Sequence, residues 1–139
     1  MPRHILSFFY YFCNVREERI IIALGCNVHR QRNMRAARAL LSEFIPDLQF
    51  TRNIKTQPIG TVGGLPYLNC LGWGFTSHPR SSLSSMLKEV EQECGNTSEK
   101  RLSGQVEMDV DLLLYGSQRH HEKDWSRPYI ATLLEEIGN

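Results

Sequence analysis

Apolar and polar residues follow distinct periodic patterns along the chain, and these patterns predict its first two elements. Residues 20–24 (IIIAL) form a largely β-branched apolar run that ends at Gly25, as expected for a strand buried on both faces. Between residues 30 and 44, apolar positions recur every three or four residues, and Pro46 follows. We therefore expect an amphipathic helix over residues 30–44, which the proline ends.

The middle of the chain alternates between apolar and polar positions. This alternation runs from Leu48 to Ile54, and it returns over residues 67–75 after a glycine-rich loop. A period of two residues is typical of a strand with one buried face, so each segment predicts a strand.

A second amphipathic helix is expected after residue 80. Ser81 or Ser82 can supply its N-cap, and Gly95 can end it. The predicted buried stripe of this helix consists of Leu83, Met86, Leu87 and Val90. The residues that fall off the stripe and should face solvent are Lys88, Glu89 and Gln92.

The predicted final strand covers residues 106–115 (VEMDVDLLLY) and follows a polar loop over residues 95–105. Strict alternation places on one face Val106, Met108, Val110, Leu112 and Leu114. The other face then carries Glu107, Asp109, Asp111, Leu113 and Tyr115. A short terminal helix is expected from the spacing of Ile130, Leu133, Leu134 and Ile137.

The order of these elements is strand, helix, strand, strand, helix, strand. This is the split βαβ order of the ferredoxin-like α+β fold, in which an antiparallel sheet carries both helices on one face. A chain of 139 residues is long enough for one such domain and too short for two. We assign the domain to residues 19–139 and treat residues 1–18 as an N-terminal extension.

Composition narrows the classes of function. The formal net charge of +1 provides no bulk attraction to nucleic acid. No apolar stretch reaches the roughly 18 residues of a membrane-spanning helix, and the apolar residues 5–13 lack the cleavage site of a signal peptide. The four cysteines include no C-x-x-C pair, which argues against a zinc site or a disulfide framework. We expect a monomer in the reducing cytoplasm, with neither a membrane nor a nucleic-acid partner.

Asp109 and Asp111 are the strongest candidates for chemistry. On a strand their carboxylates point the same way, with Cα atoms about 6.5–7 Å apart. Magnesium prefers carboxylate, water and phosphate oxygens, so the pair predicts a magnesium site that serves a nucleotide. The alternative is the solvated face of a half-buried strand. His120 and His121 are adjacent without a third ligand, which is more typical of exposed residues than of a metal site.

A series of short motifs runs along most of the chain. They are A-L-G-C-N (residues 23–27), T-Q-P-I-G (56–60), P-Y-L-N (66–69), D-V-D-L-L-L-Y (109–115) and R-P-Y-I-A-T-L-L-E-E-I (127–137). Together they resemble the 6-hydroxymethyl-7,8-dihydropterin pyrophosphokinases of folate biosynthesis. Each motif is weak alone, but their shared order and near-gapless spacing over residues 20–138 make the resemblance specific. The resemblance also implies the ferredoxin-like fold.

The resemblance implies a reaction and its residues. Pyrophosphate would pass from ATP to 6-hydroxymethyl-7,8-dihydropterin and leave AMP, with two Mg²⁺ ions held by Asp109 and Asp111. The positions that match pterin-binding residues are Thr56, Pro58, Ile59, Tyr67, Asn69 and Tyr129. The positions that match nucleotide-binding residues are Glu91, Leu112, His121 and Arg127. The implied catalytic residues are Asp109, Asp111, His121 and Arg127.

One segment departs from the pattern of that family. The loop before the aspartate strand normally carries several arginines and a tryptophan, whose positions here hold Asn96, Ser98, Leu102, Ser103 and Val106. None of these side chains can bind phosphate oxygens as arginine does. Lys100 and Arg101 lie in the same loop as candidate replacements. The alternative function is therefore a divergent homologue that binds a pterin-like ligand without efficient pyrophosphoryl transfer.

A third hypothesis is a nucleic-acid-binding module, because ferredoxin-like sheets often display stacking aromatic residues. Trp73 and Phe75 share a strand face with Tyr67 and Asn69. No basic-aromatic RNA-binding motif accompanies them and the net charge is small, so we rank this hypothesis last.

Overall fold

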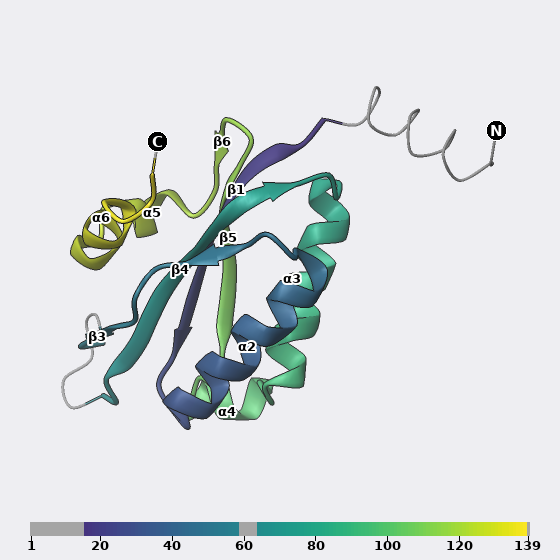
Figure 1. Cartoon of the computed structure of the whole chain (residues 1–139). Coiled ribbons are helices and arrows are strands. Elements are labelled where there is room, and N and C mark those ends of the chain that lie inside the picture. Colours follow the sequence, from purple (N-terminus) through teal and green to yellow (C-terminus); the bar gives the residue numbers. More distant parts are fainter. Residues whose placement is uncertain (1–15, 59–63, 139) are drawn as a thin grey trace.

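Strand β1 lies at the centre of a six-stranded sheet in the computed structural model, which describes residues 16–58 and 64–138 (Figure 1). The strands are β1 (Glu18–Cys26), β2 (Gln49–Phe50), β3 (Ile54–Thr56), β4 (Tyr67–Thr76), β5 (Asp109–Tyr115) and β6 (Gln118–Arg119). Their order is β2-β4-β1-β5-β6, with β3 also paired to β4, and every pairing is antiparallel. This is the ferredoxin-like arrangement, so the predicted α+β fold is confirmed.

The outer strand beside β4 is interrupted, although its alternation predicts a single strand. β2 and β3 both pair with β4, and between them the outer chain has one residue more than β4 does. Thr51 fills the gap: its N–H donates to the Leu71 carbonyl at 2.9 Å, and its hydroxyl accepts from the Leu71 N–H at 2.9 Å. This bulge satisfies backbone groups that a continuous ladder would have paired.

Two long helices cover one face of the sheet (Figure 1). The helices are α2 (Arg30–Phe44), α3 (Arg80–Glu93), α4 (Ser98–Leu102), α5 (Glu122–Trp125) and α6 (Pro128–Leu134). Helix α2 has the predicted bounds. The predicted cap of α3 at Ser81 or Ser82 is wrong, because the helix already begins at Arg80 with Pro79 in the N-cap position. The predicted end is right, since Gly95 follows the C-cap with φ +96°.

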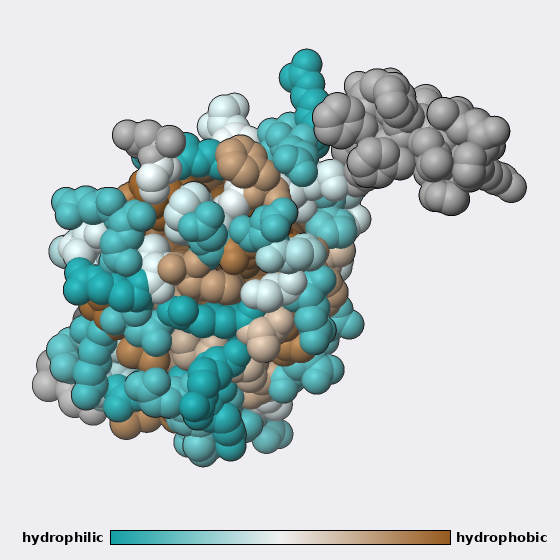
Figure 2. Space-filling view, viewed as in Figure 1, coloured by the Kyte–Doolittle hydropathy of each residue, from teal (hydrophilic) through white to brown (hydrophobic). Residues whose placement is uncertain are grey.

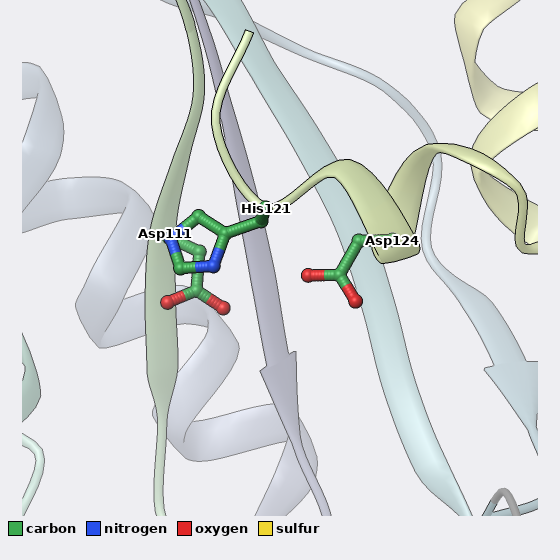
Figure 3. Close-up of side chains that lie close together, drawn as sticks. All are labelled: Asp111, His121 and Asp124. Atoms are coloured by element: carbon green, nitrogen blue, oxygen red, sulfur yellow. The ribbon is translucent and has the colours of Figure 1, made fainter.

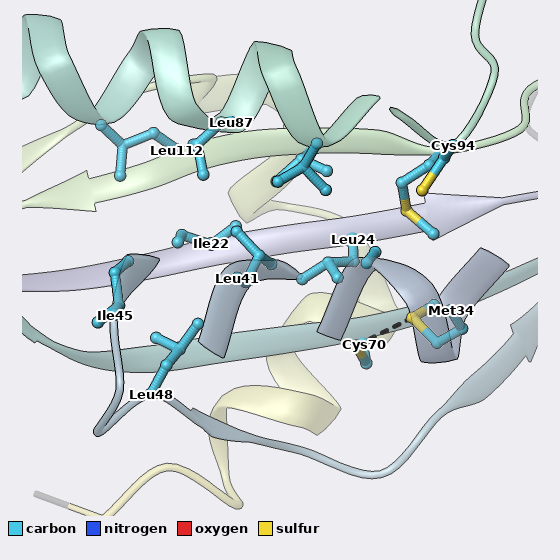
Figure 4. Packing of buried hydrophobic residues seen from close by; sticks show 14 of the residues in the cluster. Ile22, Leu24, Met34, Leu41, Ile45, Leu48, Cys70, Leu87, Cys94 and Leu112 are labelled. Atoms are coloured by element: carbon cyan, nitrogen blue, oxygen red, sulfur yellow. Dashed lines mark hydrogen bonds between the residues drawn. The ribbon is translucent and has the colours of Figure 1, made fainter. Parts of the chain in front are cut away.

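The main core lies between the sheet and these two helices (Figure 4). Ile22 and Leu24 of β1 are in its middle, and both are almost fully buried. The predicted stripe of α3 is confirmed for Leu83, Leu87 and Val90, whereas Met86 is only half-buried. Burying aliphatic side chains between two layers is the largest favourable term available to a domain of this size.

A second, smaller cluster covers the opposite face of the sheet. The predicted terminal helix is confirmed: Ile130 and Leu133 of α6, with Ile137 beyond it, pack against β-strand residues. Trp73 packs at the edge of this cluster and is half-buried, while Phe75 is 55% exposed. Helix α5 was not predicted, because four residues are too few to show a helical period.

The C-terminal half of β5 departs from strict alternation, which corrects the predicted faces. The pairing with β1 passes over Leu113, which is the extra residue of a bulge. Beyond it, Leu114 packs in the cluster under α6 and Tyr115 packs against the main core, the reverse of the prediction. The bulge lies after the two aspartates, so their shared orientation is unaffected.

Glu107 does not share the face of the aspartates, because β5 begins only at Asp109. Its carboxylate is buried and accepts hydrogen bonds from Asn33 Nδ2 at 2.5 Å and Lys100 Nζ at 3.2 Å, beside His29 Nδ1 at 3.2 Å. Burial raises the pKa of Glu107, but the hydrogen bonds outweigh it and hold the pKa below the ordinary 4.5. These contacts tie the segment before β5 to α2 and α4.

The visible surface is mainly polar, with smaller apolar areas between the polar residues (Figure 2). Large apolar side chains that are exposed include Leu65, Phe75 and Leu102. Among the described residues, no helix is both long enough and apolar enough to cross a bilayer.

Replacing Glu107 by glutamine should destabilise the fold near neutral pH by about 1.5–3 kcal/mol, because charge-assisted hydrogen bonds to a buried group are lost. A carboxyl group whose pKa falls on folding stabilises the fold above its unfolded pKa, and this contribution disappears as the pH drops through the folded pKa. The destabilisation should therefore shrink below pH 4.5. Urea unfolding at about pH 7 and about pH 3 measures it, with Glu89→Gln on the exposed side of α3 as control. If Glu107→Gln lowers the free energy of unfolding equally at both pH values, the charged carboxylate of Glu107 does not stabilise the fold.

Candidate functional site

A cleft of about 680 Å³ opens where β1 passes between β4 and β5, and the segment leading into α6 forms another wall. Ala23 and Gly25 of β1 line it, with Asp111 opposite Ala23 and Asp109 opposite Gly25 in the sheet. The small β1 side chains leave the space above the central strand open. The other lining residues are Leu24, Thr56, Gln57, Pro58, Tyr67, Asn69, Asp124, Arg127, Pro128 and Tyr129.

The described residues predicted to bind the pterin come together in this cleft. They are Thr56, Pro58, Tyr67, Asn69 and Tyr129. Ile59 lies outside the described residues. Asn69 Nδ2 donates to Thr56 Oγ1 at 2.7 Å across the pairing of β3 with β4. This hydrogen bond fixes the amide at the cleft wall.

The two tyrosines of the cleft are half-buried, Tyr67 at the start of β4 and Tyr129 in α6. Burial raises the pKa of both phenols above the ordinary 10.0. Both rings are therefore neutral at physiological pH. Neutral aromatic faces beside a fixed amide suit a flat heterocycle with hydrogen-bonding edges.

Gly25 makes room for this arrangement. A Cβ at residue 25 would lie 2.9 Å from Asn69 Oδ1, which is closer than real contacts of this kind. A larger residue would push the Asn69 amide away from Thr56. The role of Gly25 in the motif A-L-G-C-N is therefore to leave the floor of the cleft free of a side chain.

The aspartates both line the cleft, but their surroundings differ. The Arg101 guanidinium in α4 forms an ion pair with Asp109 Oδ1, and its Nη2 lies 3.9 Å from Glu91 Oε2. Asp111 is half-buried, and within residues 16–58 and 64–138 its carboxylate has no hydrogen bond or ion-pair partner at contact distance. Asp111 is thus the aspartate whose oxygens are open to a ligand.

Burial raises the pKa of Asp111 above its ordinary value. Nearby His121 lowers that pKa, whereas the charges of Asp109 and Asp124 raise it further. A divalent cation would remove both unfavourable contributions, since it compensates the buried charge and attracts all three carboxylates. The donor set of carboxylate oxygens fits a hard cation such as magnesium.

Asp124 and Arg127 stand beside the aspartates at the mouth of the cleft. Arg127 Nε pairs with Asp124 Oδ1 at 2.9 Å, one helical turn away. The sequence reasoning identified Arg127 and His121 but missed Asp124. The available signal was an acidic residue three positions before Arg127, a spacing too common to single it out.

Three of the four predicted nucleotide-binding residues do not line the cleft: Glu91, Leu112 and His121. Glu91 is buried in α3, where Oε2 accepts the Val110 N–H at 2.8 Å, and burial raises the pKa of its carboxyl group. It touches the site only through Arg101. The Leu112 side chain is buried in the main core, so any contact from this residue to a nucleotide would involve its backbone.

The loop before β5 is fastened to the domain by polar side chains of its own and by Asn27, which follows β1. Asn96 Oδ1 accepts from the Met108 N–H at 3.0 Å, and Asn27 Oδ1 accepts from the Val106 N–H at 2.7 Å. Lys100 bonds Glu107 and the Gly95 carbonyl, and so points away from the aspartates. Arg101 is the candidate replacement that reaches the carboxylate pair.

The narrow space above Gly25 gives a direct test of the cleft geometry. Gly25→Ala should cost about 1–3 kcal/mol of stability, because the new methyl group meets the Asn69 amide. Gly74→Ala, on the neighbouring strand, is the matched control, since its nearest neighbours would be 3.6 Å away. Urea unfolding compares the two variants. If Gly25→Ala is as harmless as Gly74→Ala, Asn69 does not occupy the described position.

The chain is similar to known proteins along most of its length. A family model described as 7,8-dihydro-6-hydroxymethylpterin-pyrophosphokinase matches residues 21–139. A folate synthesis bifunctional protein of Chlamydia caviae is 29% identical over an alignment of 133 residues, and the match covers 85% of this chain and 30% of that protein. The chain therefore spans less than a third of the length of this relative. The family model matches nearly the whole chain, including the segments that form the cleft. The chain therefore belongs to the 7,8-dihydro-6-hydroxymethylpterin-pyrophosphokinase family.

Proposed function

We propose that this chain transfers the pyrophosphoryl group of ATP to the hydroxymethyl oxygen of 6-hydroxymethyl-7,8-dihydropterin, with AMP as the second product. One observation carries the proposal: the pterin-side residues of β3, β4 and α6 line the same cleft as Asp109 and Asp111. Membership of the pyrophosphokinase family supports the same reaction. The name of the relative further suggests folate synthesis as the pathway.

The pterin would bind at the β4 side of the cleft. Tyr67 and Tyr129 offer ring faces for stacking, and the Asn69 amide offers directional hydrogen bonds. A ring held there would point its substituent across β1 toward β5. The hydroxymethyl oxygen is thereby held near the carboxylates, which supplies the positioning that makes transfer between two bound substrates fast.

Asp109 and Asp111 would hold the two Mg²⁺ ions that the reaction needs. Bound Mg²⁺ neutralises phosphate charge as the transferred group leaves AMP. The protein supplies the fixed carboxylates and one further cation, Arg127, which lines the same cleft. The His121 imidazole lies beside Asp111. Such preorganised charges stabilise a transition state because they do not need to reorient.

Arg101 is the proposed substitute for the missing loop arginines. Its guanidinium already lies at Asp109, so phosphate oxygens that approach this carboxylate meet a bidentate donor. It comes from α4, from a position where the family pattern has no arginine.

A second candidate function is pterin binding without efficient transfer. Asn96 supports it, because this side chain stands at a basic position of the family pattern and is committed to the Met108 backbone. The pterin side of the cleft would then be intact while the phosphate side is depleted of cations.

An assay for AMP formed from ATP and 6-hydroxymethyl-7,8-dihydropterin in the presence of Mg²⁺ tests the main proposal. If the proposal is right, the rate of AMP formation rises in proportion to the protein concentration, and chelation of Mg²⁺ abolishes it. No AMP above background, together with calorimetric binding of the pterin, would overturn the main proposal in favour of the second candidate.

Tyr129→Ala should weaken pterin binding roughly 5- to 150-fold, because one stacking contact with a flat heterocycle contributes about 1–3 kcal/mol. Calorimetry measures the affinity. Phe75→Ala is the control, since this exposed aromatic residue lies on the same strand as Tyr67 but outside the cleft. Equal effects of the two changes would place the pterin elsewhere.

Arg101→Ala should lower kcat by roughly 100-fold or more, as expected for the loss of a charged donor at the transferred group, and Arg101→Lys should recover only part of it. Steady-state AMP formation with saturating substrates is the measurement, and exposed Arg35→Ala on α2 serves as the control. An unchanged kcat for Arg101→Ala would mean that Arg101 only pairs with Asp109 and takes no part in transfer.

A further inference from the structure

Three side chains with metal-binding atoms lie close together, and one of them is Asp111 of the aspartate pair (Figure 3). Asp111 extends from β5, His121 immediately precedes α5, and Asp124 lies within α5. One ligand atom from each residue lies within 4.8 Å of the other two. Two separate segments of the chain thus bring two carboxylates and an imidazole to one point.

This group is set apart from Asp109 by charge. Asp109 is already compensated by the Arg101 guanidinium, whereas the Asp111 carboxylate accepts no hydrogen bond from the residues that the structure describes. A half-buried carboxylate without a donor is costly unless a cation is nearby. The available negative charge therefore lies on the α5 side of Asp111, not on its Asp109 side.

Asp124 is held in position for such a role. Arg127 Nε contacts its Oδ1 at 2.9 Å, which orients the carboxylate and leaves its second oxygen available. Arg127 is also the nearest competing cation, but it offsets only one of the two carboxylate charges in the group. The titratable and charged groups that face the site are Asp109, Asp111, Asp124, His121, Arg101 and Arg127.

We propose that Asp111, His121 and Asp124 bind a divalent cation in the nucleotide-free protein, without help from Asp109. The role of this ion rests on the proposed function: it would be in place before ATP binds. His121 and Asp124 thereby gain a direct role that the pairing of Asp109 with Asp111 does not give them.

The donor set indicates which ions bind best. Two carboxylates and one imidazole suit Mn²⁺, Co²⁺ and Zn²⁺ better than Mg²⁺, which prefers oxygen ligands and retains its water. Donors around such an ion are roughly 3 Å apart at ligand distances of about 2.0–2.2 Å. His121 is exposed, so a small rotation of its side chain closes the remaining separation.

The experiment is a titration of the full chain with Mn²⁺ in the absence of nucleotide. Binding is measured as the loss of the free-Mn²⁺ signal in electron paramagnetic resonance. Wild-type protein should bind one ion, and Mg²⁺ should compete at least tenfold more weakly. Asp111→Asn, His121→Gln and Asp124→Asn should each weaken Mn²⁺ binding tenfold or more.

Two matched variants separate this site from simple charge effects. Asp109→Asn removes one negative charge from β5, as Asp111→Asn does. Glu122→Gln removes an exposed negative charge from α5, the helix that contains Asp124. Glu122→Gln should leave Mn²⁺ affinity within about twofold. Asp109→Asn should weaken Mn²⁺ binding less than Asp124→Asn does, because it removes a nearby charge but no ligand. Equal weakening by Asp109→Asn and Asp124→Asn, or no Mn²⁺ binding by the wild type, would overturn the proposal.

A measurement on the wild type guards against variants that fail to fold. Zinc binding should shift the ¹⁵N ring signals of His121 and not those of exposed His29, and unshifted His121 signals would contradict the proposal. The outcome is independent of the main assay. Mn²⁺ binding without AMP formation would contradict only the proposed transfer reaction, and AMP formation without nucleotide-free Mn²⁺ binding would contradict only this inference.

Discussion

The site depends on the small size of two residues in the central strand. Ala23 and Gly25 stand between the amide wall of β4 and the carboxylates of β5, and neither fills the space above the sheet. At Gly25 the constraint is tight, since even a methyl group would meet Asn69. The neighbouring β1 positions, such as Leu24, face the main core and hold the strand in place. The same strand thus anchors the domain on one face and leaves a cleft open on the other.

The carboxylate side of the cleft is asymmetric, and the asymmetry comes from the loop before β5. That loop is held by buried Glu107 and by asparagine contacts to backbone groups, which fix α4 next to the strand. From α4, Lys100 turns to Glu107 while Arg101 turns to Asp109. Adjacent residues of one short helix therefore stabilise the loop and neutralise one of the two aspartates. The other aspartate is left facing His121 and Asp124.

Much of the fold could be predicted because its signals are periodic and local. The stripe of α2 and the apolar run of β1 predicted those elements well, and the order of elements predicted the sheet. The bulge at Leu113 could not be predicted, because three successive leucines suit either face of a sheet that is covered on both sides. The early start of α3 was missed because Pro79 caps it without a side-chain hydrogen bond.

Sequence also predicted part of the cleft. Tyr67, Asn69 and Tyr129, which the resemblance implies for pterin binding, line one cleft although they come from distant segments, and their binding role stays a prediction. The resemblance did not predict the Arg101–Asp109 pair or the place of Asp124, because both depend on how short helices dock. Such docking is decided by long-range contacts that leave no period in the sequence.

The central claim is that one cleft holds a pterin against β4 and the phosphates and cation against β5. The most direct measurement is a crystal structure of the chain with the pterin substrate, a nonhydrolysable ATP analogue and Mn²⁺, with Mn²⁺ located by anomalous scattering. The account predicts the pterin ring beside Tyr129 and Asn69, and an anomalous peak at Asp111. A pterin bound outside the cleft, or Mn²⁺ bound with no contact to Asp111, would contradict it.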